Sequence, residues 1–129
     1  MTLRIYLVED NRLIRENLTA TLAELVGSSL AGCAEGEREA VEWLGRNADS
    51  WDLAIVDLFL KQGSGLGVVA HTRSRAAGQK LVVLTNYATR EVRERCLALG
   101  ADAVFDKSHD IENLIAFCVE NRRTSDIAQ

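Results

Sequence analysis

Short apolar runs alternate with amphipathic segments along almost the whole chain. The first run covers Leu3–Val8, and the apolar side chains that follow it, at Ile14, Leu18, Leu22 and Leu25, are spaced to form one stripe of a helix. The same alternation then repeats toward the C-terminus. It predicts strands over residues 3–8, 29–34, 52–56, 80–84 and 103–105, each followed by a helix.

The later helices are predicted from their apolar positions and, in one case, from a glycine stop. The second is expected over residues 36–47, and the fourth over residues 89–99, where Gly100 supplies a C-terminal cap. The positions that define the four helices are Ala40, Val41 and Leu44, then Leu66, Val69, Ala70 and Arg73, then Val92, Cys96 and Leu99, and finally Ile111, Leu114, Ile115, Cys118 and Val119.

This pattern predicts an α/β domain in which an open five-stranded parallel sheet carries helices on both faces. The runs at 52–56 and 80–84 are almost continuously apolar, as is typical of strands covered on both faces. The expected strand order is 2-1-3-4-5, a flavodoxin-like arrangement. No repeat or linker divides the chain, so we expect one domain over residues 1–123 and a short tail over residues 124–129.

The composition narrows the class of protein. The 129 residues are 47% hydrophobic and 26% charged, which is typical of a soluble globular chain. The net charge of −4 argues against direct nucleic-acid binding by this domain, and no apolar stretch reaches the ~20 residues that cross a bilayer. The spacing of Cys33, Cys96 and Cys118 matches no metal-binding motif, so we expect these cysteines to be reduced and buried. Reduced thiols are typical of cytoplasmic proteins, and we expect a cytoplasmic protein without membrane contact.

Polar side chains lie at the carboxyl ends of the predicted strands. Glu9 and Asp10 follow the first strand and Asp57 follows the third, while Thr85 and Lys107 follow the fourth and fifth. In open parallel sheets, ligands bind outside these strand ends, near the point where the strand order reverses. We therefore expect three carboxylates, a hydroxyl and an ammonium to share one shallow pocket.

Three carboxylates repel one another, so a cation is expected among them. Oxygen ligands with open positions suit Mg²⁺, which keeps several waters and also binds phosphate oxygens. A carboxylate nucleophile yields an aspartyl-phosphate. Lys107 would supply a mobile charge and Thr85 a hydroxyl for the phosphoryl oxygens.

Each of these residues also has a simpler structural interpretation. Acids after the first strand favour the N-terminus of the next helix, Asp57 and Thr85 could cap or turn a loop, and a lysine such as Lys107 is usually exposed. The glycine-rich segment 63–67 is expected to form a turn, because it is not a dinucleotide-binding fingerprint. The functional interpretation is favoured by the joint placement of these residues at four strand ends.

The chain resembles response-regulator receiver domains from about Leu3 to Arg122. Any one of the motifs is weak, and the combination in this order and spacing is highly specific. The motifs that carry the resemblance are Leu7-Val8-Glu9-Asp10-Asn11, Ala54-Ile55-Val56-Asp57-Leu58, Gly65, Leu84-Thr85 and Phe105-Asp106-Lys107-Ser108.

The resemblance implies a switch in two-component signalling. Asp57 would be the phosphoacceptor, and Thr85 and Lys107 would be the switch hydroxyl and the phosphate-binding lysine. A sensor histidine kinase, a phosphotransfer protein or a small molecule such as acetyl phosphate would donate the phosphoryl group. The domain would take part in its own phosphorylation and dephosphorylation without any further enzymatic activity.

The resemblance also implies a site for Mg²⁺ or Mn²⁺. Asp57 and Asp10 would bind the metal directly and Glu9 mainly through water, while the backbone carbonyl of Phe59 would complete the protein ligands.

Several positions depart from the family pattern. Val104 lies where the family usually has an aromatic switch residue, so an aromatic rotation coupled to Thr85 cannot occur there. Lys61 and Ser108 lie where proline is common. A cis Lys107–Ser108 bond would cost ~3 kcal/mol or more, so it needs support from the fold or is trans.

The residues that flank the pocket are bulky. Asn86, directly after Thr85, is larger than the small residue often found there. We hypothesise that Phe59 and Tyr87 hinder an attacking water and lengthen the lifetime of a phosphoaspartate, because each lies two residues after Asp57 or Thr85.

The output surface is expected on the face formed by the helix over 89–99, the strand over 103–105 and the last helix. A movement of Thr85 toward the phosphoryl group would pull the loop over residues 86–89 with it. This face is also a candidate homodimer surface. The charges expected at its rim are Arg90, Arg93, Asp102, Glu112 and Arg122.

Two other classes of protein stay open. The first is a pseudo-receiver that acts as an interaction module without phosphorylation, although such modules usually lose one of the site residues that survive here. The second is a flavin binder or an aspartate-dependent phosphohydrolase. A hydrolase of that kind needs Asp-x-Asp, and Phe59 occupies the second position, while Glu9 and Asp10 would repel a flavin phosphate. Nothing in the chain resembles a DNA-binding or enzymatic output domain, so the downstream effector stays unknown.

Overall fold

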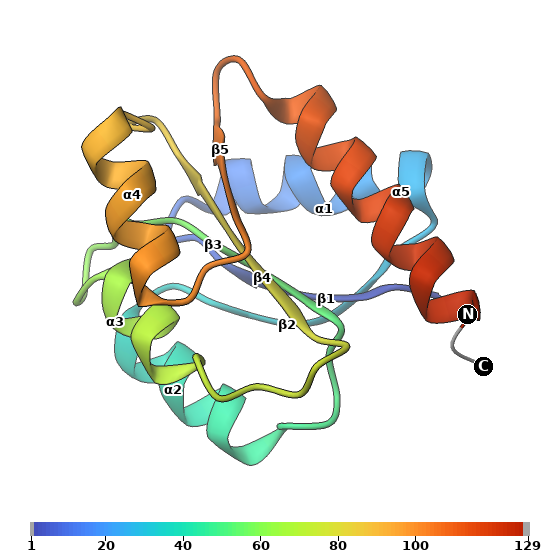
Figure 1. The fold of residues 1–129 in the computed structure, drawn as a ribbon, viewed down its shortest axis with the longest axis horizontal. Coiled ribbons are helices and arrows are strands. Elements are labelled where there is room, and N and C mark those ends of the chain that lie inside the picture. The colour runs from blue at the N-terminus through green and yellow to red at the C-terminus, as the bar shows by residue number, and fades with distance from the viewer. Residues whose placement is uncertain (1, 128–129) are drawn as a thin grey trace.

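The computed structural model describes residues 2–127, with side chains over residues 2–122. Within this range, strands and helices alternate as predicted (Figure 1). The strands are β1 (Arg4–Val8), β2 (Ser29–Ala34), β3 (Leu53–Val56), β4 (Lys80–Thr85) and β5 (Ala103–Asp106). The helices are α1 (Arg12–Val26), α2 (Glu37–Arg46), α3 (Gly65–His71), α4 (Arg90–Leu99) and α5 (Ile111–Ile127).

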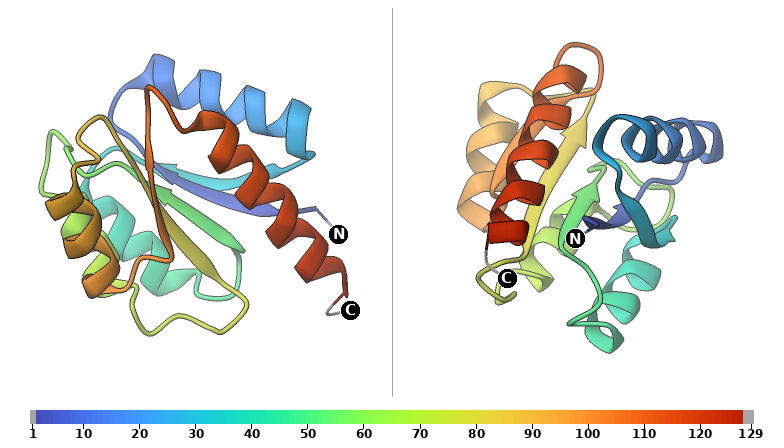
Figure 2. Two further views of the ribbon diagram at one scale, coloured as in Figure 1. Left: turned by 45° about the horizontal axis from the view of Figure 1, so that its top comes forward. Right: turned by 90° about the vertical axis from the view of Figure 1, so that its right-hand side faces the viewer.

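The five strands form one parallel sheet in the order β2-β1-β3-β4-β5, which confirms the predicted order. Figure 2 shows α1 and α5 on one side of the sheet and α2, α3 and α4 on the other. Successive strand residues point to opposite faces. Ile55 and Val82 therefore join the core under α1 and α5, while Val56 and Val83 join the core under the other three helices.

Polar N-cap residues fix where α1, α3 and α4 begin, after the carboxyl ends of β1, β3 and β4. The side chains of Asn11, Ser64 and Thr89 each accept a hydrogen bond from a backbone N–H two or three residues later, at 3.0–3.2 Å. The predicted cap at the end of α4 is confirmed. Gly100 has a φ of 117°, in the left-handed region that favours glycine.

The buried stripe of α1 differs from the predicted one. Leu18, Leu22 and Val26 are buried, whereas Ile14 and Leu25 are 37% and 55% exposed. The helix packs through the i, i+4 row that ends at Val26, and Leu25 is rotated by about 100° from that row. Ile14 lies on the row, but it lines an open groove at the first turn of the helix.

The prediction of three buried cysteines is wrong for Cys33. Cys96 and Cys118 are fully buried, but Cys33 is exposed because it lies on β2, the edge strand, which is only partly covered. No helix within residues 2–127 is long and apolar enough to span a membrane.

Three smaller differences concern helix faces and ends. Val41 is half-buried, unlike its buried neighbours on α2. The third helix ends at His71, so Arg73 lies outside it, because Thr72 ends the helix with hydrogen bonds to carbonyls of the last turn. Helix α5 continues past residue 123 to Ile127 and so includes the first part of the predicted tail. Residues 128–129 lie outside the described range.

Candidate functional site

The structure brings the three predicted carboxylates together where β1 and β3 end. Backbone hydrogen bonds from Glu9 to Ala34 (3.0 Å) and from Asp57 to Val8 (2.9 Å) continue the sheet ladder past both strand ends. One carboxylate oxygen from each of Glu9, Asp10 and Asp57 lies within 4.8 Å of the others. Glu9 and Asp57 are only 3% and 7% exposed. This is a buried concentration of negative charge.

Lys107 supplies the positive charge of the site. Its Nζ donates to Glu9 Oε1 at 2.7 Å and to Asp57 Oδ2 at 3.1 Å. Its backbone N–H donates to the carbonyl of Thr85 at 3.0 Å, which places it directly after β5. Burial disfavours the ammonium ion, but the hydrogen bond to Glu9 and the charge of Asp57 outweigh it, so the pKa of Lys107 is raised.

The negative charge of Asp57 is less well compensated by its surroundings than the positive charge of Lys107. Burial raises the pKa of Asp57 above its ordinary value of 3.8, and the charge and hydrogen bond of Lys107 and a backbone N–H from Phe59 only partly offset this effect. The neighbouring charge of Asp10 raises the pKa further. An additional cation bound beside Asp57 would therefore be stabilising.

The donor set fits a hard divalent cation. All three side chains offer carboxylate oxygens, and Asp10 is partly exposed, which gives the cluster an open side. The Phe59 backbone lies in the loop after Asp57, where its N–H donates to Asp57 Oδ1 at 3.4 Å. A metal role for its carbonyl stays a prediction.

The loop after β3 approaches the Asp57 backbone very closely. A Cβ atom built on Gly65 would lie 2.1 Å from the carbonyl oxygen of Asp57. The backbone N–H of Ser64, just before it, donates to Glu37 Oε1 on α2 at 2.7 Å, so the loop has little freedom to move away. Residues 65–67, which were predicted to belong to a turn, instead begin α3, and position 65 requires glycine for a steric reason.

Gly65→Ala is expected to lower the free energy of unfolding by about 1–3 kcal/mol, the usual cost of overpacking. The added methyl group must displace either the Asp57 backbone or the start of α3. Urea denaturation of the variant and the parent measures the effect. Gly78→Ala is the matched control, because nothing lies within 4 Å of a Cβ at Gly78. Equal losses in both variants would contradict the steric argument.

Thr85 is fully buried at the end of β4. Its Oγ1 accepts a hydrogen bond from the backbone N–H of Tyr87 at 3.1 Å, so the hydroxyl is bound to its own loop. Asn86 is exposed and, with Lys107, lines a groove of about 330 Å³ beside α1. Thr85 ends β4 and Asn86 follows it, so both lie at the carboxyl edge of the sheet, where the three carboxylates also lie.

Phe59 and Tyr87 lie in the two loops that leave the site. Their ring centroids are 4.8 Å apart in an edge-to-face arrangement, and the residues are 58% and 59% exposed. The contact joins the loop after β3 to the loop after β4. Whether these rings hinder water stays a hypothesis.

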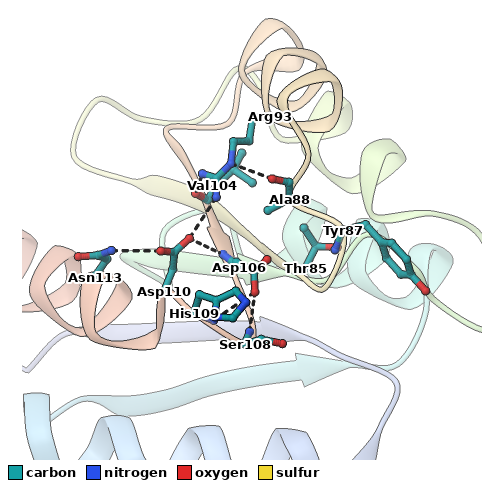
Figure 3. Close-up of polar contacts among 10 residues, drawn as sticks. All are labelled: Thr85, Tyr87, Ala88, Arg93, Val104, Asp106, Ser108, His109, Asp110 and Asn113. Atoms are coloured by element: carbon teal, nitrogen blue, oxygen red, sulfur yellow. Dashed lines mark hydrogen bonds and ion pairs between the residues drawn. The ribbon is translucent and has the colours of Figure 1, made fainter.

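The structure also shows where two of the positions that depart from the family pattern lie. Val104 is buried in the core, and its backbone carbonyl accepts a hydrogen bond from Arg93 at 2.8 Å (Figure 3). The Lys107–Ser108 peptide bond is trans. The N–H of Ser108 donates to Asp106 Oδ1 at 2.7 Å, which turns the chain into the loop before α5.

Three of the five charges predicted at the output rim are bound internally. Arg93 contacts three segments, Asp102 pairs with Arg75 at 2.5 Å and accepts from the N–H of Leu81, and Arg122 donates to the carbonyl of Val26. Within residues 2–122, Arg90 pairs only along its own helix, with Glu94, and Glu112 is exposed. The local sequence carries no signal for these internal bonds, since their partners are distant.

The chain matches the response regulator receiver domain model over residues 5–118. It is 32% identical over 114 residues to the virulence transcriptional regulatory protein PhoP of Salmonella typhimurium, an alignment that covers 88% of this chain and 49% of that protein. The chain thus spans about half the length of the curated relatives that it matches.

Solved structures share the fold at lower identity. One is a response regulator protein from Burkholderia pseudomallei with a phosphorylated aspartic acid, a calcium ion and citrate (24% identity, TM-score 0.76, 98% of this chain and 75% of that one). Another is the CheX–CheY–BeF₃–Mg²⁺ complex from Borrelia burgdorferi (15% identity, TM-score 0.79, 95% of this chain and 88% of that one).

Proposed function

Because the chain belongs to the family of response regulator receiver domains, we propose that it is a switch that accepts a phosphoryl group on Asp57. The observation that carries the proposal is the cluster of Glu9, Asp10 and Asp57 with Lys107 bonded across it. Acids on an ordinary surface would be solvated and separate, whereas Glu9 and Asp57 are buried beside the partly exposed Asp10 in spite of the repulsion among the three charges.

The chemistry needs one nucleophile and two electrostatic partners. A carboxylate oxygen of Asp57 forms a bond to phosphorus while the bond from phosphorus to the donor nitrogen or oxygen breaks, and the donor leaves with that electron pair. Lys107, now shared with Glu9, is within reach of the new phosphoryl group and can balance its charge. The Thr85 hydroxyl can donate to a second phosphoryl oxygen after its loop moves.

Glu9, Asp10, Asp57 and the Phe59 carbonyl would hold Mg²⁺ or Mn²⁺. When bound, the metal offsets the negative charge of the carboxylates and of the transferring phosphoryl group. A protein of the same fold carries a phosphorylated aspartic acid together with a calcium ion, which supports this assignment.

The expected partner is a sensor histidine kinase or a phosphotransfer protein, and the expected output is the control of an effector. The similarity to transcriptional regulatory proteins favours control of transcription by a partner or a fused domain. The face formed by α4, β5 and α5 is the proposed output and homodimer surface. Because Arg93, Asp102 and Arg122 are bound internally, Arg90 and Glu112 are its most available predicted charges.

Incubation with acetyl phosphate and Mg²⁺ is expected to add one phosphoryl mass to the parent, as measured by intact mass spectrometry. Asp57→Asn is expected to remove the gain, and EDTA is expected to suppress it. Peptide mapping locates the group. A gain that survives in Asp57→Asn would place the acceptor elsewhere. No gain with acetyl phosphate or with a panel of histidine kinases would instead favour a phosphorylation-independent interaction module.

A further inference from the structure

The Arg93 side chain binds three separate segments of the chain. From α4, its Nε donates to the carbonyl of Ala88 at 3.0 Å, its Nη1 to the carbonyl of Val104 on β5 at 2.8 Å, and its Nη2 to Asp110 Oδ2 at 3.1 Å. Figure 3 shows these groups gathered around the guanidinium. A planar fork of N–H donors can make three such bonds at once, whereas an ammonium on a flexible stem cannot match the geometry.

Asp110 is itself held in place in the loop before α5. Its Oδ2 also accepts the backbone N–H of Asp106 at 2.9 Å, and its Oδ1 accepts from Asn113 at 3.2 Å. The Asp106 N–H and then Arg93 lower the pKa of Asp110, so the carboxylate stays ionised. Arg93 is therefore bonded to a fixed carboxylate on one side and to β5 on another.

The third partner, Ala88, belongs to the loop that carries the Thr85 switch. Within this loop the N–H of Tyr87 donates to Thr85 Oγ1, and the N–H of Thr89 donates to the carbonyl of Tyr87 at 2.8 Å. Any movement of the loop that brings Thr85 toward Asp57 must shift Ala88 with it or break these bonds. The bond from Arg93 to Ala88 opposes that shift.

We propose that Arg93 is a positioning residue, which holds the Thr85 loop in its resting place by bonding Ala88 to Val104 and Asp110. The inference rests on the proposed phosphorylation of Asp57 and deepens it. The buried valine on β5 offers no side chain that could rotate with the switch, so the connection between β5 and the loop runs through the Arg93 guanidinium and the Val104 backbone. Phosphorylation then works against this latch, since the phosphoryl group favours the loop position that the latch disfavours.

A latch that stabilises only the resting state has a measurable thermodynamic consequence. If Arg93 favours the resting state, its loss must favour whatever binds the other state, by the same factor. Beryllofluoride with Mg²⁺ is a suitable probe, because it mimics a phosphoryl group on a carboxylate without covalent transfer. Removing the guanidinium is expected to raise the affinity for this probe, an effect that simple loss of packing would not produce.

The experiment titrates beryllofluoride and Mg²⁺ into the parent, Arg93→Ala, Arg93→Lys and Arg90→Ala, with calorimetric detection. Arg93→Ala is expected to bind about fivefold more tightly than the parent, the low end of typical coupling. Arg93→Lys should lie closer to the alanine variant than to the parent. Arg90→Ala is the matched control from the same helix, and it should bind like the parent. The Arg90 side chain is 91% exposed and, among the side chains that the structure describes, it pairs only with Glu94. Unchanged or weaker binding by Arg93→Ala, or equal tightening in Arg90→Ala, overturns the proposal.

Two further arms keep the result interpretable. Asp110→Asn removes the charge that orients Arg93 and should tighten binding in the same direction, and it decides the question if Arg93→Ala does not fold. Hydrogen exchange of the Tyr87 and Thr89 amides, measured without any phosphoryl analogue, should be faster in Arg93→Ala than in Arg90→Ala. A parent that binds no beryllofluoride overturns the proposed function, and unchanged exchange would then overturn the latch separately.

Discussion

Lys107→Met is expected to lower the free energy of unfolding by about 3 kcal/mol in Mg²⁺-free buffer, the low end of the cost of removing one partner from a buried ion pair. The ammonium is hydrogen-bonded to both Glu9 and Asp57, whose side chains are 4% and 9% exposed. Methionine keeps the length of the stem and removes the charge. The two carboxylates would then remain buried beside Asp10 without a cation.

The directions of the pKa shifts of Lys107 and Asp57 predict whether each charge stabilises or destabilises the folded protein at neutral pH. The pKa of Lys107 is raised above 10.5 in the folded protein, so its stabilising contribution is complete at pH 7 and is lost only as the pH rises past that value. The pKa of Asp57 is also raised, so the ionised carboxylate costs stability as the pH rises above 3.8. Removing one or the other charge should therefore have opposite effects.

Asp57→Asn is the matched control for Lys107→Met. At pH 7 with EDTA it is expected to raise the denaturation midpoint by a few degrees, and the gain should shrink as the pH falls toward 4. Thermal and urea unfolding followed by circular dichroism measure both variants. Added Mg²⁺ should stabilise the parent more than Asp57→Asn. If both variants lose stability to the same extent, the site is held by packing and the electrostatic account fails.

The carboxylate cluster as a whole is expected to cost the folded protein stability. A domain selected for stability alone would not gather three carboxylates at one sheet edge and bury two of them, because even a well-placed lysine leaves the charge of Asp57 under-compensated. The excess negative charge is useful if cations and a phosphoryl group are meant to bind there. The predicted cost in stability at this edge of the sheet is thus an argument that the carboxylates serve a function there.

The sequence predicts the sheet and the strand-end residues well because both follow from one-dimensional patterns. A run such as Ala54–Val56 reveals a strand covered on both faces, and a residue that directly follows such a run, such as Asp57, must lie at the carboxyl edge. The placement of Lys107 beside Asp57 then needs only the strand order. No side-chain detail enters these steps.

Side-chain contacts between distant segments are not predictable in the same way. Arg93 looks like a surface charge because the segment of α4 around it, Arg90–Arg95, is mostly charged. Its partners Val104 and Asp110 lie 11 and 17 residues further along the chain. Leu25 looks buried for the converse reason, since an apolar residue near a stripe cannot reveal where the helix meets the sheet. These outcomes depend on packing angles and side-chain reach, which the sequence pattern does not contain.

Phe59→Asn is expected to shorten the lifetime of the phosphorylated protein by about tenfold, which corresponds to ~1.4 kcal/mol in the barrier to hydrolysis. The ring lies two residues after Asp57 and packs edge-to-face on Tyr87, so the two aromatics brace each other across the loops that leave the site. A small polar side chain would open this boundary to water and remove the support for the second ring. Tyr87→Ala should act in the same direction, and Tyr87→Phe, which keeps the ring, should leave the lifetime near that of the parent.

Loss of the phosphoryl mass with time, after removal of acetyl phosphate, measures the rate, with Leu25→Asn as the control for an exposed apolar residue on α1. Equal lifetimes for Phe59→Asn and Leu25→Asn would mean that water reaches the phosphoaspartate by a path that these rings do not border.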